Sequence, residues 1–230
     1  MYLSRVFLNP ERRATRDWVS SPQRMHAAVL AGFPESNAAN RPLWRLDKGQ
    51  HRFELLMVSR ERPDLMHLVE NGGWSTSEPD VAEYLPFLSR IEVGRRYLFR
   101  LRANPVRSTK AGVATGERGR IVNVGSRAMQ ELWLVERGAS FGFSIPSDDA
   151  DLRSGAGELL ARRNLAITER GTQRFSKHIA GARNQVTLAA VQFDGLLEVV
   201  DANALRQALT GGIGRGKAYG CGLLTLAPIS

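Results

Sequence analysis

The first ninety residues alternate strand-like and helix-like segments in one defined order. Tyr2–Leu8 is short, rich in apolar residues and followed by Asn9-Pro10, a combination typical of a strand that ends at a turn. A charged linker, residues 11–18, comes next. Ser21-Pro22 then supplies an N-cap residue and a first-turn proline, which predict a helix continuing to Phe33.

Two strands and a second helix follow in this region. Leu43–Leu46 and Phe53–Val58 are strand candidates joined by the polar turn DKGQH, and Pro63–Val69 predicts a short helix. The resulting order, β-α-β-β-α-β, is that of the ferredoxin-like fold. We therefore expect residues 1–90 to form one ferredoxin-like (RRM-like) α+β domain.

A second α+β domain is expected over residues 94–230, because strand and helix signals alternate again. Ser126 and Asp201 are N-cap candidates for two helices, and Gly138 is expected to end the first of them. Residues 148–167 receive no assignment. The other expected elements are a strand at Tyr97–Ala103, a basic loop at 107–120, a strand at Phe141–Ile145, a hairpin of Arg174–Ile179 and Val186–Phe193 around the tip AGARNQ, a continuation at Leu196–Val200, and a last strand GLLTLA.

A glycine-rich loop near the C-terminus, residues 211–217, fits G-x-x-x-x-G-K, the first seven places of a nucleotide-binding P-loop. The eighth place is Ala218, which lacks the hydroxyl that would hold Mg²⁺. The loop also follows a predicted helix and precedes a strand, whereas a P-loop joins a strand to a helix N-terminus. A nucleotide-hydrolysis site is therefore disfavoured, and a nucleotide hydrolase is only the third alternative. The glycines still let the main chain approach a phosphate closely, and solvated charges on an ordinary connection are the alternative.

The charge balance indicates a polyanionic partner. The chain has 32 Lys and Arg against 23 Asp and Glu, a net charge of +9 and a pI near 10.5. Such an excess favours nucleic acid or, less often, an anionic membrane surface. A soluble protein that is basic without such a partner is the alternative.

Cys221 is the only cysteine, which excludes an internal disulfide and favours a reducing compartment. No apolar run approaches the ~18 residues of a membrane span, and the N-terminus has no signal-peptide pattern. We expect a cytoplasmic protein without a membrane partner.

Four blocks of the sequence resemble a known family. The stretch GIGRGKAYGCGLLTLAP, residues 212–228, is similar to the segment that closes the CRISPR-associated repeat-RNA endoribonucleases. The opening MYLSRVFLNP, the central FRLRANPV (99–106) and VQFDGLLEVVD (191–201) are similar to the subtype I-E branch, the CasE family. These blocks run in order from residue 1 to residue 228.

The resemblance implies two tandem ferredoxin-like domains, in agreement with the element order. It also implies metal-independent cleavage of precursor CRISPR RNA at the 3′ base of the repeat stem-loop, with no cofactor. The product would stay bound, with the other Cascade subunits as further partners. A non-catalytic RNA-hairpin-binding subunit of the same fold is the alternative.

His26 is the candidate catalytic residue. Cleavage by a neighbouring 2′-OH, which leaves a 2′,3′-cyclic phosphate and a 5′-OH, needs a proton acceptor, a proton donor and positive charge at the phosphate. Histidine suits proton transfer at neutral pH, and His26, His51, His67 and His178 are available. The family resemblance selects His26, within the pattern P-x-x-M-H that begins at Pro22.

Gln23 departs from the family pattern, since some members carry a tyrosine at that place. Glutamine forms hydrogen bonds but does not readily exchange a proton. Either a tyrosine is dispensable, or Arg24 or a distant lysine assists His26.

The RNA stem is expected to be held through phosphates and 2′-OH groups. A solvated charged face is the alternative for each candidate. The candidate RNA-binding residues are Arg24, Arg107, Lys110, Arg118, Arg120, Arg174, Lys177, His178, Arg183, Arg215 and Lys217, together with the loop glycines Gly212, Gly214, Gly216, Gly220 and Gly222.

Overall fold

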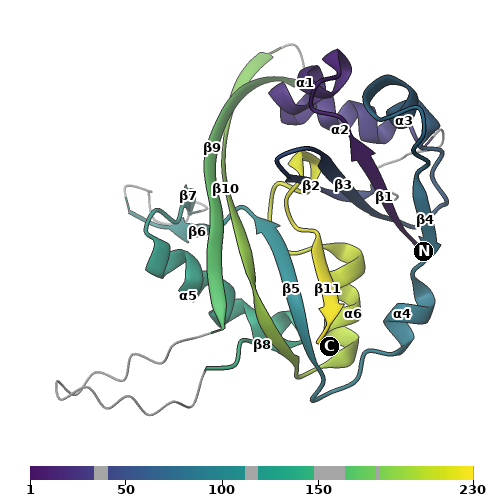
Figure 1. The fold of residues 1–230 in the computed structure, drawn as a ribbon. Coiled ribbons are helices and arrows are strands. Elements are labelled where there is room, and N and C mark those ends of the chain that lie inside the picture. Colours follow the sequence, from purple (N-terminus) through teal and green to yellow (C-terminus); the bar gives the residue numbers. More distant parts are fainter. Residues whose placement is uncertain (34–40, 112–118, 148–163, 180–181, 230) are drawn as a thin grey trace.

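Two antiparallel β-sheets, joined in sequence by a short helix, form the body of the molecule (Figure 1). The structure is a computed structural model that describes residues 1–33, 41–111, 119–147, 164–179 and 182–229. None of the helices in these ranges is long and apolar enough to span a membrane.

The first sheet has the strand order β2-β3-β1-β4. Three helices lie together at one end of the view in Figure 1, and their apolar side chains pack on Val6, Leu8, Leu55 and Met57 of the sheet. With the first and third strands central, this is the ferredoxin-like arrangement that the sequence predicts. The elements are β1 (Tyr2–Leu8), α1 (Arg13–Ser20), α2 (Pro22–Leu30), β2 (Leu43–Lys48), β3 (Phe53–Ser59), α3 (Met66–Gly72) and β4 (Asp80–Glu83).

The helix α1 corrects the prediction of a charged linker at residues 11–18. Thr15 is buried, and its hydroxyl donates to the carbonyl oxygen of Gly72 at 2.7 Å, which ties α1 to the end of α3. Trp18 packs against the same core. The arginines that suggested a linker lie on the exposed side of this helix.

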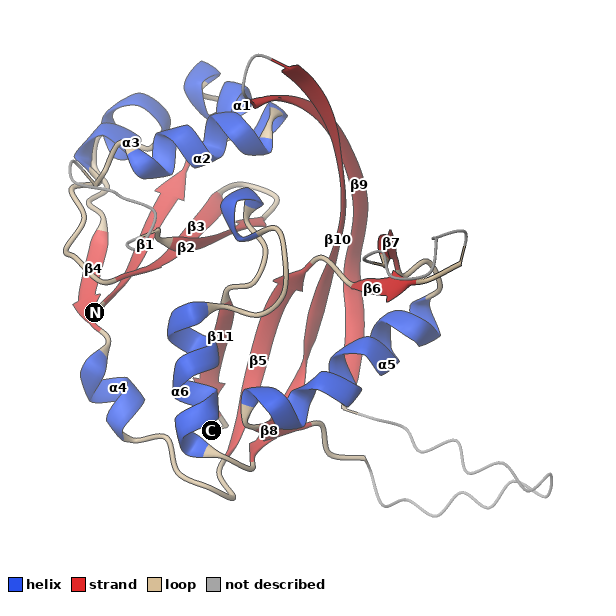
Figure 2. Ribbon diagram, turned by 180° about the vertical axis from the view of Figure 1, so that it is seen from behind, coloured by secondary structure: helices blue, strands red, loops and turns tan. Residues whose placement is uncertain are grey.

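The second sheet repeats the arrangement of the first, with the order β11-β5-β10-β8 and β9 paired to β10 (Figure 2). The helices α5 and α6 cover one face. The short helix α4 (Leu85–Ser89) connects the two sheets, and the domain division between residues 90 and 94 stays a prediction. The elements are β5 (Arg96–Ala103), β6 (Val106–Thr109), β7 (Arg120–Asn123), α5 (Arg127–Gly138), η2 (Ala139–Phe141), β8 (Phe143–Ser144), β9 (Leu165–Ile179), β10 (Ala182–Val199), α6 (Ala202–Gly211), η3 (Lys217–Tyr219) and β11 (Leu224–Pro228).

The two predicted N-caps of this half are confirmed. Ser126 accepts a hydrogen bond from the backbone N–H of Met129, and Asp201 accepts from those of Asn203 and Ala204. Both side chains satisfy backbone donors that the first turn of a helix leaves unpaired.

Three local predictions are wrong. The expected loop at 107–120 begins and ends in the paired strands β6 and β7, and residues 112–118 lie outside the described residues. The expected strand at Phe141–Ile145 is reduced to β8, because a 3₁₀ turn occupies Ala139–Phe141. The expected six-residue hairpin tip is shorter, since Ala182 already pairs with Ile179.

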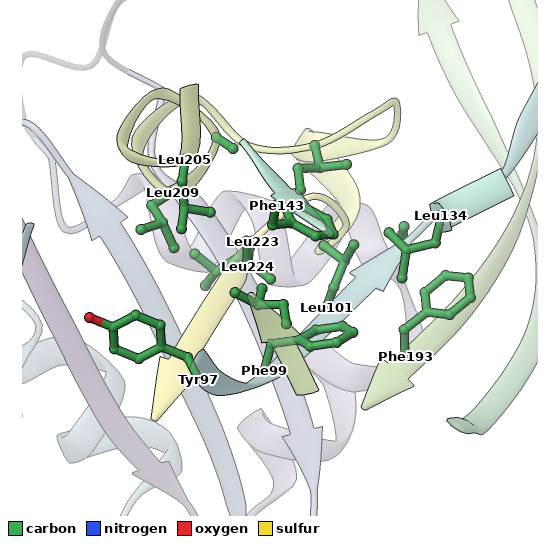
Figure 3. Packing of buried hydrophobic residues seen from close by; sticks show 14 of the residues in the cluster. Tyr97, Phe99, Leu101, Leu134, Phe143, Phe193, Leu205, Leu209, Leu223 and Leu224 are labelled. Carbon is green, nitrogen blue, oxygen red and sulfur yellow. The ribbon is translucent and has the colours of Figure 1, made fainter. Parts of the chain in front are cut away.

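The larger hydrophobic core lies under α5 and α6. Phe99, Leu101, Phe143 and Phe193 come from three strands and point toward Leu134, Leu205 and Leu209 of the helices (Figure 3). The same cluster includes Leu43 and Val58 of the first sheet. The two sheets therefore share packed side chains, which fixes the elements that carry His26 relative to those that carry the glycine-rich loop.

Candidate active site

The glycine-rich loop leaves α6, forms the short 3₁₀ turn η3 and enters β11. Its position after a helix and before a strand agrees with the argument against a P-loop site. At Gly220 the φ angle is 76°, and an added Cβ would lie 2.7 Å from Cζ3 of Trp44. Glycine is therefore required there by both backbone conformation and space. All five predicted loop glycines have positive φ angles: Gly212, Gly214, Gly216, Gly220 and Gly222.

Backbone hydrogen bonds hold this loop against the second sheet. Gly222 donates its N–H to the carbonyl oxygen of Arg102 at 2.7 Å, and Ile213 donates to Gly222 at 2.9 Å. The Lys217 ammonium donates to the carbonyl oxygen of Gly211 at 2.5 Å. These contacts give the loop one defined shape and direct η3 toward the first sheet.

His26 lies on the second turn of α2. Pro22 occupies the first turn as expected, while Ser21 stands at the N-cap position without a capping hydrogen bond from its side chain. Met25 and Val29 are buried in the core of the first sheet. His26 is displaced from that apolar face by a fraction of a turn, so its ring is half-buried, with the Nδ1 atom inside.

A cavity of about 310 Å³ opens beside His26, between α2, the ends of β2 and β3, and the glycine-rich loop. Arg41, Arg60 and Lys217 line it together with His26. Ser59 and Thr210 add hydroxyl-bearing side chains, and the described residues that line the cavity include no Asp or Glu. The arrangement suits a bound anion next to a proton-transferring imidazole.

Among the predicted RNA-binding residues whose side chains the structure describes, Lys217 is the one that lines this cavity. Arg24 is exposed, pairs with Asp17 and is not among the lining residues. Arg215 is exposed on the loop, where its backbone bridges to Asn104. Gln23 is half-buried on α2 and also does not line the cavity.

The predicted residues on β6 and β7 form a separate basic surface. Arg107, Lys110 and Arg120 are exposed. Arg107 pairs with Val122 and Thr109 with Arg120 in the strand register, which places the two arginines on the same face of the hairpin. Arg118 lies outside the described residues.

The predicted residues of the long hairpin lie on β9 and β10. Arg174 is exposed on β9. The backbone register pairs His178 with Arg183 and Lys177 with Asn184 near the tip, and the side chains of Lys177, His178 and Arg183 lie outside the described part of the structure. Figure 1 shows this hairpin rising from the second sheet toward α1 of the first.

Two other histidines have positions that argue against catalysis. The His67 ring nitrogen Nε2 donates to the carbonyl oxygen of Ala28 at 2.8 Å, which joins α3 to α2. His51 is exposed in the turn between β2 and β3 and does not line the cavity.

Arg41 and Arg60 are candidate site residues that sequence reasoning missed. Neither belongs to a motif, and each lies just outside a predicted strand. Their position at the cavity depends on how β2 and β3 pair, which composition and spacing do not reveal. The one sequence signal that could have identified them is that an arginine lies near one end of each of the two predicted strands.

Comparison with known proteins identifies relatives over the whole chain. Residues 1–228 match the family model described as CRISPR associated protein. CRISPR-associated endoribonuclease Cse3 of Thermus thermophilus is 31% identical over 99% of this chain and 100% of its own length. The CRISPR system Cascade subunit CasE of Escherichia coli is 27% identical over all of both chains.

A solved structure supports the same relationship. A structure of CRISPR endoribonuclease Cse3 bound to a 19-nucleotide RNA aligns with a TM-score of 0.78 at 27% identity, covering 99% of this chain and 100% of that chain. The family and fold that the sequence resemblance implies are both confirmed.

Proposed function

The chain belongs to the CRISPR-associated protein family of Cse3 and CasE, and we propose that it is the endoribonuclease that matures precursor CRISPR RNA. Cleavage takes place at the 3′ base of the repeat stem-loop, without metal. The product stays bound, and the protein remains as a subunit of a Cascade complex in the cytoplasm. The observation that carries this proposal is the cavity that His26 lines together with three basic side chains.

The chemistry is an internal transesterification. The 2′-oxygen of the nucleotide before the scissile linkage attacks the phosphorus as its proton leaves, and the bond from phosphorus to the 5′-oxygen breaks as that oxygen gains a proton. The products are a 2′,3′-cyclic phosphate and a 5′-OH. His26 takes or gives one of these protons, which is a contribution of about 10²–10⁴ in rate for a well-placed acid or base.

The helix α2 and the turn η3 position the reacting groups. The helix presents His26, and η3, which packs against α2, presents Lys217 to the same cavity. A phosphodiester bound in this cavity would have an imidazole and three cations among the side chains around it. His26 is half-buried, whereas Arg41, Arg60 and Lys217 are exposed at the cavity.

Repeat RNA incubated with the protein in EDTA tests the proposal. Site-specific cleavage is expected for the unaltered protein, and His26→Ala is expected to bind the hairpin with unchanged affinity but not to cleave it. His51→Ala is the matched control and should cleave normally. Undiminished cleavage by His26→Ala would refute the role of His26, and tight binding without cleavage by the unaltered protein would favour a non-catalytic hairpin-binding subunit.

A further inference from the structure

We propose that Arg60 is a catalytic residue that binds the scissile phosphate in the cavity that His26 also lines, and that Arg41 completes this phosphate subsite; this inference rests on the function proposed above. The ligand is the phosphodiester at the cleavage site, and the transition state that follows from it. The proposal identifies the cation that the sequence leaves unassigned, since Gln23 and Arg24 do not line the cavity.

Arg41 and Arg60 lie beside the adjoining ends of β2 and β3. Leu43 pairs with Val58 where β2 meets β3. Extending this antiparallel pairing by two residues would bring Arg41 opposite Arg60, and both are exposed at the cavity wall. Like charges directly across a pair of strands destabilise it. An anion bound between two neighbouring arginines would remove their mutual repulsion.

The backbone that carries Arg60 is held in place. Ser59 is 4% exposed, and its hydroxyl donates to the carbonyl oxygen of Glu61 at 2.7 Å. Arg60 therefore stands between two fixed neighbours at the end of a central strand. Within the described ranges, Arg60 forms no ion pair, so its guanidinium is available to a ligand.

Lys217 is less suited to the same task. Its ammonium already donates to the carbonyl oxygen of Gly211, which uses part of its donor capacity to hold the loop. A guanidinium offers two parallel N–H donors to two phosphate oxygens, whereas an ammonium acts as a point charge. As the 2′-oxygen attacks, negative charge grows on the non-bridging oxygens, and a bidentate arginine stabilises that charge more in the transition state than in the ground state.

The test compares Arg60→Ala, Arg60→Lys and Arg41→Ala with Arg62→Ala, an exposed arginine two residues further on that does not line the cavity. Single-turnover cleavage is measured at saturating RNA, and affinity is measured on RNA with a 2′-deoxy scissile nucleotide. Arg60→Ala is expected to slow cleavage about 10²–10³-fold, as loss of one transition-state donor does, while affinity falls far less. Arg60→Lys should recover part of the rate, and Arg62→Ala should match the unaltered protein.

A sulfur substitution at the scissile phosphate separates direct contact from a structural role. Replacing one non-bridging oxygen by sulfur should slow the unaltered protein, and this effect should shrink in Arg60→Ala because the contact is already absent. A rate for Arg60→Ala equal to that of Arg62→Ala, or an undiminished sulfur effect, would overturn the role of Arg60. Neither result would contradict the proposed function. That function is contradicted instead if His26→Ala cleaves normally.

Discussion

Phe175 of β9 packs edge-on against Tyr219 of η3, with ring centroids 4.8 Å apart and ring planes at 66°. Leu188 and Cys221 bury the same contact. Because η3 also packs against α2, this one short turn contacts both the long β9–β10 hairpin and the helix that carries His26. The position of the hairpin is therefore linked to the geometry of the cavity.

Removing this ring contact should weaken RNA binding without unfolding the protein. Edge-to-face aromatic pairs contribute about 0.5–1.5 kcal/mol beyond their buried area, so Phe175→Ala is expected to raise the Kd for a non-cleavable hairpin about 2- to 10-fold. Thr172→Ala, an exposed change on the same strand, is the control. Combining Phe175→Ala with Tyr219→Ala should add little to either change, and fully additive losses would contradict the linkage.

Alanine at Gly220 should destabilise the loop for two separable reasons. The first reason is the positive φ angle, and the second is overlap of the added Cβ with Trp44. Gly94→Ala isolates the effect of the φ angle, since φ at Gly94 is +83° and an added Cβ meets nothing within 4 Å. We expect a loss of about 1–2 kcal/mol there, and about 1–3 kcal/mol more at Gly220, where the Cβ would overlap Trp44. Gly171→Ala, with open space and no positive φ, should be close to neutral. Urea unfolding checks the order, and equal values for Gly94→Ala and Gly220→Ala would contradict the overlap with Trp44.

Arg45 fastens the first sheet to the second through a buried set of contacts. Its side chain is 2% exposed and pairs with both carboxylate oxygens of Asp47, at 2.7 and 3.0 Å. It also donates to the carbonyl oxygens of Arg100 and Leu223, at 3.0 and 3.2 Å. Leu223 follows the glycine-rich loop directly, so Arg45 connects β2 to the loop that forms the cavity.

Breaking this buried pair should be costly. Arg45→Met leaves Asp47 without its main partner, and such a loss is about 3–5 kcal/mol in the free energy of unfolding. Arg95→Met is the matched control because Arg95 forms an exposed pair with Glu92, for which about 1 kcal/mol or less is expected. Urea unfolding measures both. A loss at Arg45 no larger than that at Arg95 would show that the buried pair does not hold the sheets together.

The sequence predicted those features that depend on neighbouring residues. The strand Tyr97–Ala103 alternates apolar and basic residues, and the helix after Asp201 has its N-cap, so both appear nearly as expected. The helix at Arg13–Ser20 was missed because it is held by the hydroxyl of Thr15, which bonds to Gly72 at the end of α3, and by Trp18 and Val19, which pack on the core of the first sheet. The contact between Thr15 and Gly72 joins residues more than fifty positions apart, which local patterns do not reveal.

The residues of the candidate site also differ in how far the sequence could predict them. His26 was identified because its motif is contiguous, and Lys217 because it belongs to the glycine-rich loop. Arg60 and Arg45 were missed because their roles arise from pairing between strands and between sheets. An isolated arginine has the same appearance in a sequence whether it is exposed, as Arg62 is, or buried, as Arg45 is.

Acid should weaken the contact between Arg100 and Asp194 on the second sheet. Burial alone would raise the pKa of Asp194, but hydrogen bonds from Arg100 and Thr168 and the charge of Arg100 outweigh it and hold the pKa below the ordinary 3.8. A carboxylate with a lowered pKa stabilises the fold above its unfolded pKa, and that stabilisation is lost as the pH falls toward the folded value. Asp194→Asn should therefore be less stable at neutral pH and lose less stability on acidification.

Urea unfolding at neutral pH and near pH ~3 measures this difference. Glu92→Gln, which alters an exposed pair, serves as the control. The gap in stability between the unaltered protein and Asp194→Asn should narrow in acid. A gap that stays constant across this range would contradict the lowered pKa.

The slope of log K for RNA binding against log salt concentration should depend on the number of arginines that contact phosphates. Arg174 on the long hairpin and Arg107 and Arg120 on the β6–β7 hairpin are exposed, and we expect each of them to contact a phosphate of the stem. Each phosphate contact releases counterions and steepens the plot of log K against log salt concentration by about 0.7–0.9. Replacing any one of these arginines by alanine should lower the slope by that amount, because the loss removes one contact without altering the others.

Arg95→Ala is the control for this measurement, since Arg95 pairs with Glu92 beside the end of β5 that lies away from the glycine-rich loop. Its slope should equal that of the unaltered protein. An unchanged slope for Arg174→Ala would remove the hairpin from the RNA interface. Unchanged slopes for Arg107→Ala and Arg120→Ala together would confine the interface to the long hairpin and the cavity, since the two arginines share one face and would contact the stem as a pair.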